Sequence, residues 1–515
     1  TNIDEDSWRQ DEIIGWIYQY FNDKEKDDVF DRLYNKKQKI KVEDIPAATQ
    51  LFTPDWIVDW IVDNSLGTLW NEIKQGKREY KKVEDIKLLD PCCGSGHFLV
   101  KAFDMLYEMY VEEGIYTKEE IPYKILDNNI YGIDIDLRAV QLTGLILFIK
   151  VKSYLKENGF NSNTKGKLSV NLVCADSILL NGNRLKELKE KHKDNKTILK
   201  MIEIIYEEFE DVRLKGSLIQ PEKKLFPLFE EYKNRIALRE LSKVKRTKKK
   251  QTEGQQNLLE KAEEISFSEY KSQRDFTKEE RELMISLDAI YSEAIKANDI
   301  SRQLFASEAK KSVKLVDIFM KQYDVVVTNP PYMGKKNMSD KLREFINANY
   351  NGYENDLYSA FIIRCLQFLN AKGILGMITQ ESFMFISSYS KLRDYLLDII
   401  TVKKLIHLGP FAFEEISGQK VSTCMFVFEK SPAFENSKGV YVKLNDINTS
   451  ADKEIVLKEI QSGKHQQNRV FNVKQTFFKN IEGSPIIYWI SQKLMDILSN
   501  NQSLYPKAEA KTGIN

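Results

Sequence analysis

Blocks of apolar residues alternate with polar stretches along the chain in a pattern that predicts strands and helices in turn. Short apolar runs at residues 86–90, 129–136 and 168–176 predict strands, because each is strand-sized and bounded by polar or glycine residues. Residues 97–111 and 137–155 carry apolar side chains at three- and four-residue spacing, which predicts helices between these strands. Regular alternation of strand and helix indicates βαβ units, so the sequence predicts an α/β fold with a Rossmann-like parallel sheet.

A charged segment interrupts this alternation at residues 181–318. Lys, Glu, Arg and Leu dominate it at helical spacing, which predicts a helical insertion with a charged loop around "KVKRTKKK", residues 243–250. The alternation then resumes, with predicted strands at 323–329, 373–380, 402–409 and 422–430 and a predicted helix at 356–369. The later strands lack long helices between them, so we expect the sheet to finish with an antiparallel hairpin.

Composition narrows the class of protein. With 515 residues the chain is too long for one core, and 42% hydrophobic and 30% charged residues are typical of a soluble globular protein. The formal net charge of +1 lacks the overall basic character that is typical of nucleic-acid-binding proteins. A DNA-binding role therefore requires locally clustered basic residues or parts outside this chain. No apolar run is long enough to span a membrane.

Five cysteines without a CxxC pair and four histidines argue against a disulfide framework or a metal site, so we expect no metal and a reducing cytoplasm. The run "KVKRTKKK" could track phosphates, although most such runs are solvated loops. His97 opens a predicted helix and is expected to pack or to contact backbone rather than to act as an acid or base.

A glycine turn, "DPCCGSG", joins the predicted strand 86–90 to the helix after it. Gly94 and Gly96 let the backbone approach a ligand closely, and Asp90 stands at the carboxyl end of the strand, where open parallel sheets bind ligands. Leu99 occupies the third glycine position of a dinucleotide site, and a carboxylate here would repel pyrophosphate. An acidic residue before the turn instead suits the cationic cofactor S-adenosylmethionine, the alternative being a purely structural turn.

The next two predicted strands also end in carboxylates. Asp134, with Ile135 beside it, is placed to accept both ribose hydroxyls of that cofactor, whereas Asp136 is expected to be the N-cap of the following helix. Asp176 follows the third strand and could accept the exocyclic amine of the cofactor's adenine. Each aspartate alone could instead be an ordinary solvated residue at the end of a strand. Three successive strands that end in a carboxylate, however, indicate a ligand-binding site.

The stretch "DVVVTNPPYMG", residues 324–334, ends a buried strand on an amide, two prolines and an aromatic ring. The side-chain oxygen of Asn329 and the carbonyl of Pro330 could accept the two hydrogens of an exocyclic adenine amine, and Pro330 and Pro331 preset these acceptors by fixing φ. Tyr332 would stack on a base turned out of the duplex. The alternative is an ordinary Asn-Pro-Pro turn.

These two motifs in this order resemble the gamma class of amino-group DNA methyltransferases, and the fold expected is then a Rossmann-like methyltransferase sheet. "FTP", residues 52–54, is similar to the helix-opening motif that this class uses to contact the methionine end of the cofactor, which implies a cofactor contact for Thr53. From its own sequence, Thr53 is expected to be an N-cap with Pro54 at the first helical position. "FEEISGQKVSTCMFVFEK", residues 413–430, resembles the late hairpin of the class, with Phe413 packing the cofactor side.

A longer similarity, carried by "DEIIGWIYQYF", by residues 45–70 and by the insertion after Asp176, resembles the PglX methyltransferases of BREX phage-defence systems. The resemblance implies adenine-N6 methylation of double-stranded host DNA in the bacterial cytoplasm. It also implies other BREX proteins and phage-encoded DNA mimics as partners. Two alternatives stay open: the methylating part of a bifunctional restriction–modification enzyme, or a non-catalytic DNA-binding or scaffold subunit. Cytosine-C5 methylation is rejected, because Cys92 lies inside the glycine turn where the cofactor would sit.

The patterns and the resemblance together divide the chain. We expect an N-terminal helical segment at 1–48, the cofactor-binding half of the methyltransferase domain at 49–180, the helical insertion at 181–318, the catalytic half at 319–430, and a connection to a largely absent target-recognition region at 431–515. Thr1 in place of methionine and the ending "AKTGIN" predict that the natural chain is longer.

Overall fold

A computed structural model describes residues 24–160 except 34, 42, 50 and 51, residues 170–176, parts of 186–200, residues 201–228, 314–413, 421–464 and 468–491, and residues 493, 494 and 497. The chain divides into two compact units, one formed by Thr1–Leu172 and Tyr323–Asn515 and the other by Val173–Gln322. "DEIIGWIYQYF", "KVKRTKKK" and "AKTGIN" lie outside the described residues.

The strands form one nine-stranded sheet in the order β3-β2-β1-β4-β5-β7-β6-β8-β9. They are β1 (Leu88–Asp90), β2 (Ile130–Asp134), β3 (Asn171–Cys174), β4 (Tyr323–Thr328), β5 (Leu369–Gln380), β6 (Thr401–Gly409), β7 (Thr423–Glu429), β8 (Lys438–Lys443) and β9 (Val470–Lys474). β1 pairs in parallel with β2 and β4, and β4 with β5, whereas β7 runs antiparallel between β5 and β6. The Rossmann-like α/β fold and the late antiparallel pair are thus as predicted.

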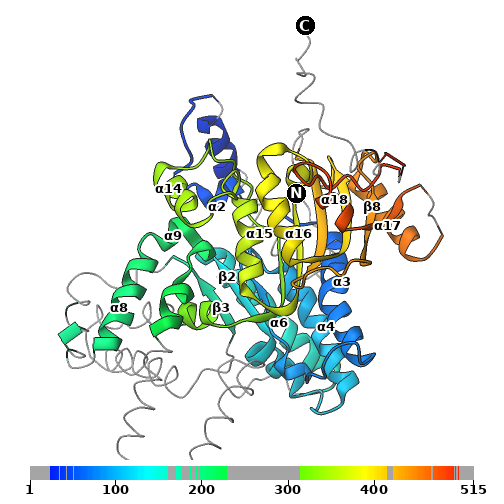
Figure 1. Cartoon of the computed structure of the whole chain (residues 1–515). Helices are drawn as coiled ribbons and strands as arrows, with labels where there is room; N and C mark the ends of the chain where they lie inside the picture. Colours follow the sequence, from blue (N-terminus) through cyan, green and yellow to red (C-terminus); the bar gives the residue numbers. More distant parts are fainter. Residues whose placement is uncertain are drawn as a thin grey trace, which may run out of the picture. The chain divides into compact units, whose positions relative to one another are not determined.

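The helices occupy both faces of this sheet. They are α2 (Ile45–Thr49), α3 (Asp55–Lys74), α4 (His97–Glu113), α5 (Ile121–Lys124), α6 (Leu137–Glu157), α14 (Asp340–Asn349), α15 (Leu357–Phe368), α16 (Ser390–Ile399), α17 (Ser450–Gln461) and α18 (Thr476–Lys479). One apolar core joins α3, α4 and α6 to alternate residues of the strands, and it contains no residue of α15. Because strand side chains alternate between faces, α15, which packs on β4 and β5, covers the opposite face (Figure 1).

The strand order reverses between β1 and β4. From β1 the chain builds outward through β2 to β3, and it then returns to place β4 on the other side of β1, with Leu88 opposite Val325 and Leu89 opposite Val326. A crevice opens at such a switch point outside the carboxyl ends of the two strands. This topology puts the end of β1, which is Asp90, beside the end of β4, which Asn329 follows.

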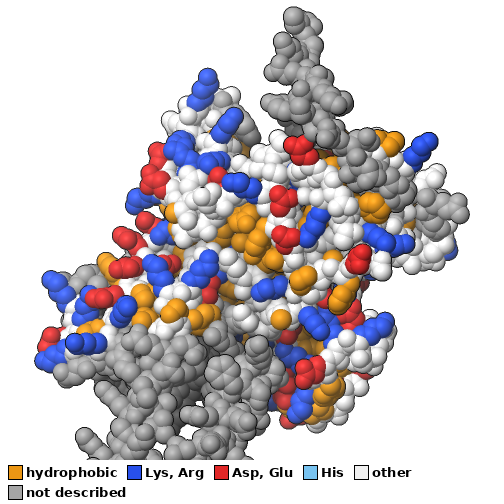
Figure 2. All heavy atoms as spheres, in the orientation of Figure 1, with side chains coloured by type: hydrophobic (Ala, Val, Ile, Leu, Met, Phe, Trp, Pro, Cys, Tyr) orange, Lys and Arg blue, Asp and Glu red, His pale blue; other side chains and the backbone are white. Residues whose placement is uncertain are grey.

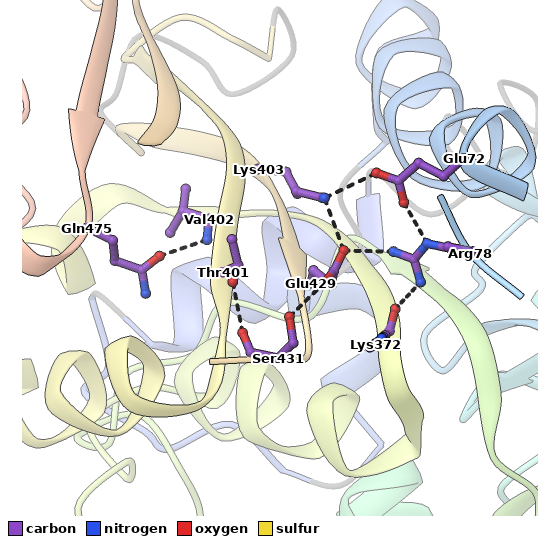
Figure 3. A network of polar contacts seen from close by, with 9 residues as sticks. All are labelled: Glu72, Arg78, Lys372, Thr401, Val402, Lys403, Glu429, Ser431 and Gln475. Carbon is purple, nitrogen blue, oxygen red and sulfur yellow. Dashed lines mark hydrogen bonds and ion pairs between the residues drawn. The ribbon is translucent and has the colours of Figure 1, made fainter. Parts of the chain in front are cut away.

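A network of charged side chains lies at the other end of the strands, away from Asp90 and Asn329 (Figure 3). Arg78, just after α3, contacts Glu72 at 2.5 Å and Glu429 at 2.7 Å, and its Nη1 donates to the Lys372 carbonyl at 2.5 Å. Lys403 contacts the same two carboxylates at 3.1 and 3.0 Å. The network therefore joins the end of α3 to β5, β6 and β7.

Three features differ from the sequence predictions. Residues 431–515, which were expected to form a connecting segment, contain β8, α17 and β9. The two strands extend the same sheet, with β8 parallel to β6. α16 separates β5 from β6, although the sequence analysis predicted no helix between these strands. α3 begins at Asp55 with Pro54, not Thr53, at the N-cap position, because Pro54 has a ψ of 141° and so stands outside the helix. The Thr53 hydroxyl instead accepts from Asn329.

The second unit is described in part. Its helices include α8 (Lys196–Phe209) and α9 (Val212–Lys215), and the rings of Phe209 and Phe319 pack edge to face with centroids 6.2 Å apart. This part of the insertion is helical, as its charge and spacing predict.

Candidate active site

The glycine turn after β1 is held by two side chains. The Gly94 N–H donates to Oδ2 of Asp134 at 2.8 Å, and the Gly94 carbonyl accepts from the Thr143 hydroxyl at 2.8 Å. Gly94 and Gly96 have φ values of +51° and +90°, which favour glycine. A Cβ on Gly96 would lie 2.5 Å from Thr143, whereas a Cβ on Gly94 would meet nothing within 4 Å. The turn is thus packed on one side and open on the other.

Asp90 and Asp134 face this turn from the ends of β1 and β2. Oδ1 of Asp90 accepts from the Cys92 N–H at 3.0 Å, and Oδ1 of Asp134 accepts from the Asp136 N–H at 2.8 Å. Burial raises the pKa of Asp90 to about 7, against the lowering effect of Thr328 and the Cys92 N–H. Burial likewise raises the pKa of Asp134 to about 6. Burial therefore makes both carboxyl groups costly to ionise, and both lie at the carboxyl ends of their strands.

Oδ2 of Asp90 has no hydrogen bond of ordinary geometry among the described residues, and neither has the Thr328 hydroxyl beside it. Both are buried, with Asp90 0% exposed. An unsatisfied buried carboxylate oxygen costs folding free energy, so such atoms cluster where a ligand completes their hydrogen bonds. The arrangement favours a cationic or hydrogen-bond-donating ligand.

Asn329 follows β4 directly and contacts the start of α3. Its Nδ2 donates to the Thr53 hydroxyl at 3.1 Å, across 276 residues of sequence. Thr53 is 5% exposed, and Oδ1 of Asn329 is buried with no donor among the residues that the structure describes. One end of the amide is therefore fixed, and the other end presents an unused acceptor. The sequence analysis predicts that this oxygen accepts a hydrogen of the amine of the target base.

Pro330 is buried, and Pro331 and Tyr332 are half-buried after it. The Tyr332 hydroxyl donates to the Ile378 carbonyl of β5 at 3.2 Å, and burial raises its pKa. Its ring meets Tyr358 edge to face, with centroids 6.2 Å apart. The ring is thus anchored at its hydroxyl end beside Asn329.

Asp356 is a residue that the sequence analysis did not single out as part of the site. It is 6% exposed and forms the N-cap of α15, and its Oδ1 accepts from the Met333 N–H at 2.9 Å. The Leu357 N–H donates in turn to the Met333 carbonyl at 3.1 Å. Asp356 therefore pins the residue after Tyr332 to α15. Its signature in the sequence is Asp-x-x-Ser before an apolar helix, a capping box.

His97 is the first residue of α4. Its ring packs edge to face on Phe52 with centroids 4.2 Å apart, and burial lowers its pKa to about 4. The imidazole is therefore uncharged at neutral pH. This environment agrees with the predicted packing role.

The structure brings Thr53, Asn329 and the turn at Asp90, Gly94, Gly96 and Asp134 to one edge of the sheet. Ile135 follows Asp134 with a half-buried side chain, and Asp136 is the N-cap of α6, as predicted. Phe413 is buried in the core with α3. Asp176 follows β3 and belongs to the second unit, so its contact with an adenine stays a prediction.

Within the described part of the chain, no group of three or more His, Cys, Asp or Glu side chains could hold a metal ion. No helix in those same regions has the length and apolar character needed to cross a bilayer.

Two family models match the chain. The model described as Eco57I restriction-modification methylase covers residues 128–413, which include the Asn329 segment and the Asp134 strand. The model described as N-6 DNA Methylase covers residues 26–169, which include Thr53 and the glycine turn.

Curated relatives match over nearly the whole chain. The adenine-specific methyltransferase PglX of Lacticaseibacillus casei (strain Zhang) is 30% identical over 96% of this chain and 38% of its own length. The adenine-specific methyltransferase BrxX of Escherichia coli O9:H4 (strain HS) is 31% identical over 95% of this chain and 38% of its own length. This chain therefore spans about two fifths of the length of these relatives. A solved nuclease-deletion mutant of the Type ISP restriction-modification enzyme LlaGI, in complex with a DNA substrate mimic, matches with a TM-score of 0.47 and 14% identity, over 87% of this chain and 28% of that one.

Proposed function

The chain belongs to the Eco57I restriction-modification methylase family and is of the PglX and BrxX type, and on this premise we propose that it methylates adenine N6 in DNA. S-adenosylmethionine would supply the methyl group from its sulfonium. The observation that carries the proposal is the buried, unused Oδ1 of Asn329, fixed by Thr53 at the switch point of the sheet.

The exocyclic amine of adenine is a poor nucleophile, because its lone pair is delocalised into the ring. Oδ1 of Asn329 and the Pro330 carbonyl would accept its two hydrogens and favour a pyramidal nitrogen whose lone pair points at the methyl group. S-adenosylmethionine would supply the methyl carbon, with the electron pair of its carbon–sulfur bond going to sulfur. The methylated nitrogen would then lose one proton to water, because the oxygens of Asn329 and Pro330 accept hydrogen bonds but are too weakly basic to keep a proton. Positioning and electrostatics do this work, and no covalent intermediate with the protein is needed.

The residues around the glycine turn fit the cofactor. The open side of Gly94 leaves room for it, the uncompensated Oδ2 of Asp90 suits its positive charge, and Asp134 keeps lone pairs for the ribose hydroxyls. Thr53 and Ile135 complete the proposed contacts. Tyr332 would stack on the everted adenine, because its anchored ring needs no reordering.

Methylation-sensitive sequencing tests the proposed function directly. DNA from cells that carry the intact protein should contain N6-methyladenine at one recurring short site, and DNA from cells that lack the protein should not. Cells with an Asn329→Ala protein at equal abundance provide the control. An unmodified genome in the presence of the intact, abundant protein would argue instead for the scaffold alternative.

The raised pKa values predict how cofactor binding depends on pH. A bound cation favours the ionised forms of Asp90 and Asp134, so binding releases protons, and affinity should rise about tenfold from about pH 5.5 to about pH 7.5 and then level off.

Without cofactor the folded state holds protons that the unfolded chain releases above the usual pKa of 3.8, so folding stability falls as pH rises from about 4 to about 7.

Calorimetry with S-adenosylmethionine across this range is the measurement. Asp90→Asn should weaken binding at pH 7.5 and flatten its pH dependence. Asp398→Asn, which changes an exposed carboxylate paired with Lys479, should leave both unchanged. A wild-type affinity that is constant across the range, or an Asp90→Asn protein with the wild-type slope, would exclude Asp90 from the cofactor site.

Because its relatives are PglX and BrxX methyltransferases, we propose a role in BREX-type phage defence in a bacterial cytoplasm, where methylation would mark host DNA as self. Double-stranded DNA is its proposed substrate. Other BREX proteins and phage-encoded DNA mimics are its proposed partners. The bifunctional alternative differs only in having a nuclease segment elsewhere in the polypeptide.

A further inference from the structure

Two short basic segments, 300 residues apart in sequence, meet beside residues 329–332, the proposed catalytic loop. Residues 35–41 read "NKKQKIK" and residues 335–343 read "KKNMSDKLR". Together they carry eight Lys or Arg side chains and one Asp, whereas the whole chain has a formal net charge of +1. We call these two segments the basic ridge.

Two contacts join the segments. Nζ of Lys39 lies 2.6 Å from Oδ1 of Asp340, and the Ile40 N–H donates to the Asn337 carbonyl at 3.4 Å. Ile40 is 6% exposed, so an apolar side chain anchors residues 35–41 in the core while the lysines on either side point outward. The juxtaposition is therefore built into the fold.

Most of the acidic neighbours are already paired. Asp340 contacts both Lys39 and Arg343, and the exposed side chains of Lys36 and Asp31 lie 3.0 Å apart. Lys335 contacts Glu354 at 3.5 Å and Arg32 contacts Asp44 at 2.7 Å. Lys37, Lys41 and Lys336 are exposed and have no ion pair among the described residues. Surface pairs of this kind are weak, and the unpaired lysines leave the ridge with a local excess of positive charge.

The ridge continues directly from the catalytic loop. Lys335 is three residues after Tyr332, at most about 11 Å along an extended chain, and its N–H donates to the Asn355 carbonyl beside Asp356. In Figure 2, Lys and Arg side chains gather over the dark-blue N-terminal helix and the adjoining α2 and α14 of Figure 1. A DNA strand carries a phosphate about every 3.4 Å of helix axis, so a duplex that delivers a base to Tyr332 must place several phosphates nearby.

We propose that the basic ridge binds the phosphate backbone of the DNA that carries the target adenine. The inference rests on the proposed function for the identity of the substrate. The ridge positions the duplex without reading its sequence, because lysine contacts to phosphate are independent of the base. Seven of its eight cations are Lys, whose flexible point charge suits contact with the phosphate backbone better than base recognition in a groove.

The test compares two triple variants of the intact protein. Lys37→Glu, Lys41→Glu and Lys336→Glu remove the unpaired cations of the ridge. The matched control changes Lys77, Lys438 and Lys464 to Glu. These three exposed lysines lie just after α3, at the start of β8 and just after α17, and they have no ion pair in the described regions. Both proteins carry the same change in net charge, so only the place of the charge differs. S-adenosylmethionine affinity serves as the check that each protein is folded.

Fluorescence anisotropy with a labelled duplex is measured over a series of salt concentrations. The ridge variant should bind at least about tenfold more weakly, and the slope of log K against log salt should shrink by about 2–3, since each lost phosphate contact removes about 0.9. The control should keep the wild-type slope within about 1. Equal slopes for both variants would overturn the inference.

A second experiment tests whether the basic ridge binds an anionic membrane instead of DNA. Vesicles of phosphatidylserine and phosphatidylcholine are offered to the same proteins, and loss of vesicle binding with unchanged DNA binding would assign the ridge to an anionic membrane and overturn the proposal. Failure of the inference is distinguishable from failure of the proposed function. An intact protein that methylates DNA but whose ridge variant binds normally refutes the ridge alone, whereas a protein that binds DNA through the ridge without methylating refutes the activity alone.

Discussion

Replacing Asn329 by alanine is expected to lower methyl transfer by at least about 10²–10³-fold, the usual effect of removing one preorganised group that stabilises developing charge. Oδ1 of Asn329 is buried and has no donor among the described residues, so alanine removes an acceptor that is proposed to engage the substrate amine. Single-turnover transfer of a labelled methyl group to a duplex measures the loss. S-adenosylmethionine affinity should change little, since Asn329 contacts Thr53 and not the glycine turn.

Thr53 supplies the matched comparison. Thr53→Ser keeps the hydroxyl that accepts from Nδ2 of Asn329 and should retain most of the transfer rate, whereas Thr53→Val removes the partner and frees the amide to rotate. If Thr53 also contacts the cofactor, the valine variant alone will bind S-adenosylmethionine more weakly. Normal methylation by Asn329→Ala would contradict the assignment of the clamp.

The second large effect is expected on folding stability, from a change in the charged network around Arg78 at the other end of the strands. Glu429 holds both Arg78 and Lys403, whose side chains are 13% and 31% exposed. Replacing Glu429 by leucine leaves two partly buried cations without this partner, so the free energy of unfolding should fall by about 2–3 kcal/mol, less than for a fully buried pair because water still screens the charges. Urea unfolding followed by circular dichroism measures the change.

Two controls locate the cause. Glu429→Gln keeps one acceptor oxygen, which can accept from Arg78 while the new NH2 group donates to the Ser431 hydroxyl. It loses the charge and should cost less than leucine. Lys479→Met breaks the exposed contact with Asp398 and should change stability by less than about 1 kcal/mol. An unfolding midpoint of Glu429→Leu equal to that of Lys479→Met would show that the network contributes nothing beyond an ordinary surface pair.

Sequence alone identified the elements whose physics is local. A buried strand is readable as an apolar run, a helix as a repeat of three and four, and a tight turn as paired glycines, so β1, β2, β4, α4 and α6 were placed from periodicity. Asp136 as an N-cap also follows from its immediate neighbours. The motifs around Asp90 and Asn329 were recognisable because each is a contiguous stretch.

Contacts between distant segments were decided only by the tertiary structure. Nothing in the sequence near residue 53 indicates that the Thr53 hydroxyl accepts from Asn329 rather than capping α3, because a hydroxyl takes whichever partner the fold brings close. The contact of Asp356 with the Met333 N–H, beside the proposed catalytic residues, depends on the fold for the same reason. The basic ridge was invisible in a chain of nearly zero net charge, since charge adds up in space, and residues 35–41 and 335–343 become neighbours only when Ile40 enters the core.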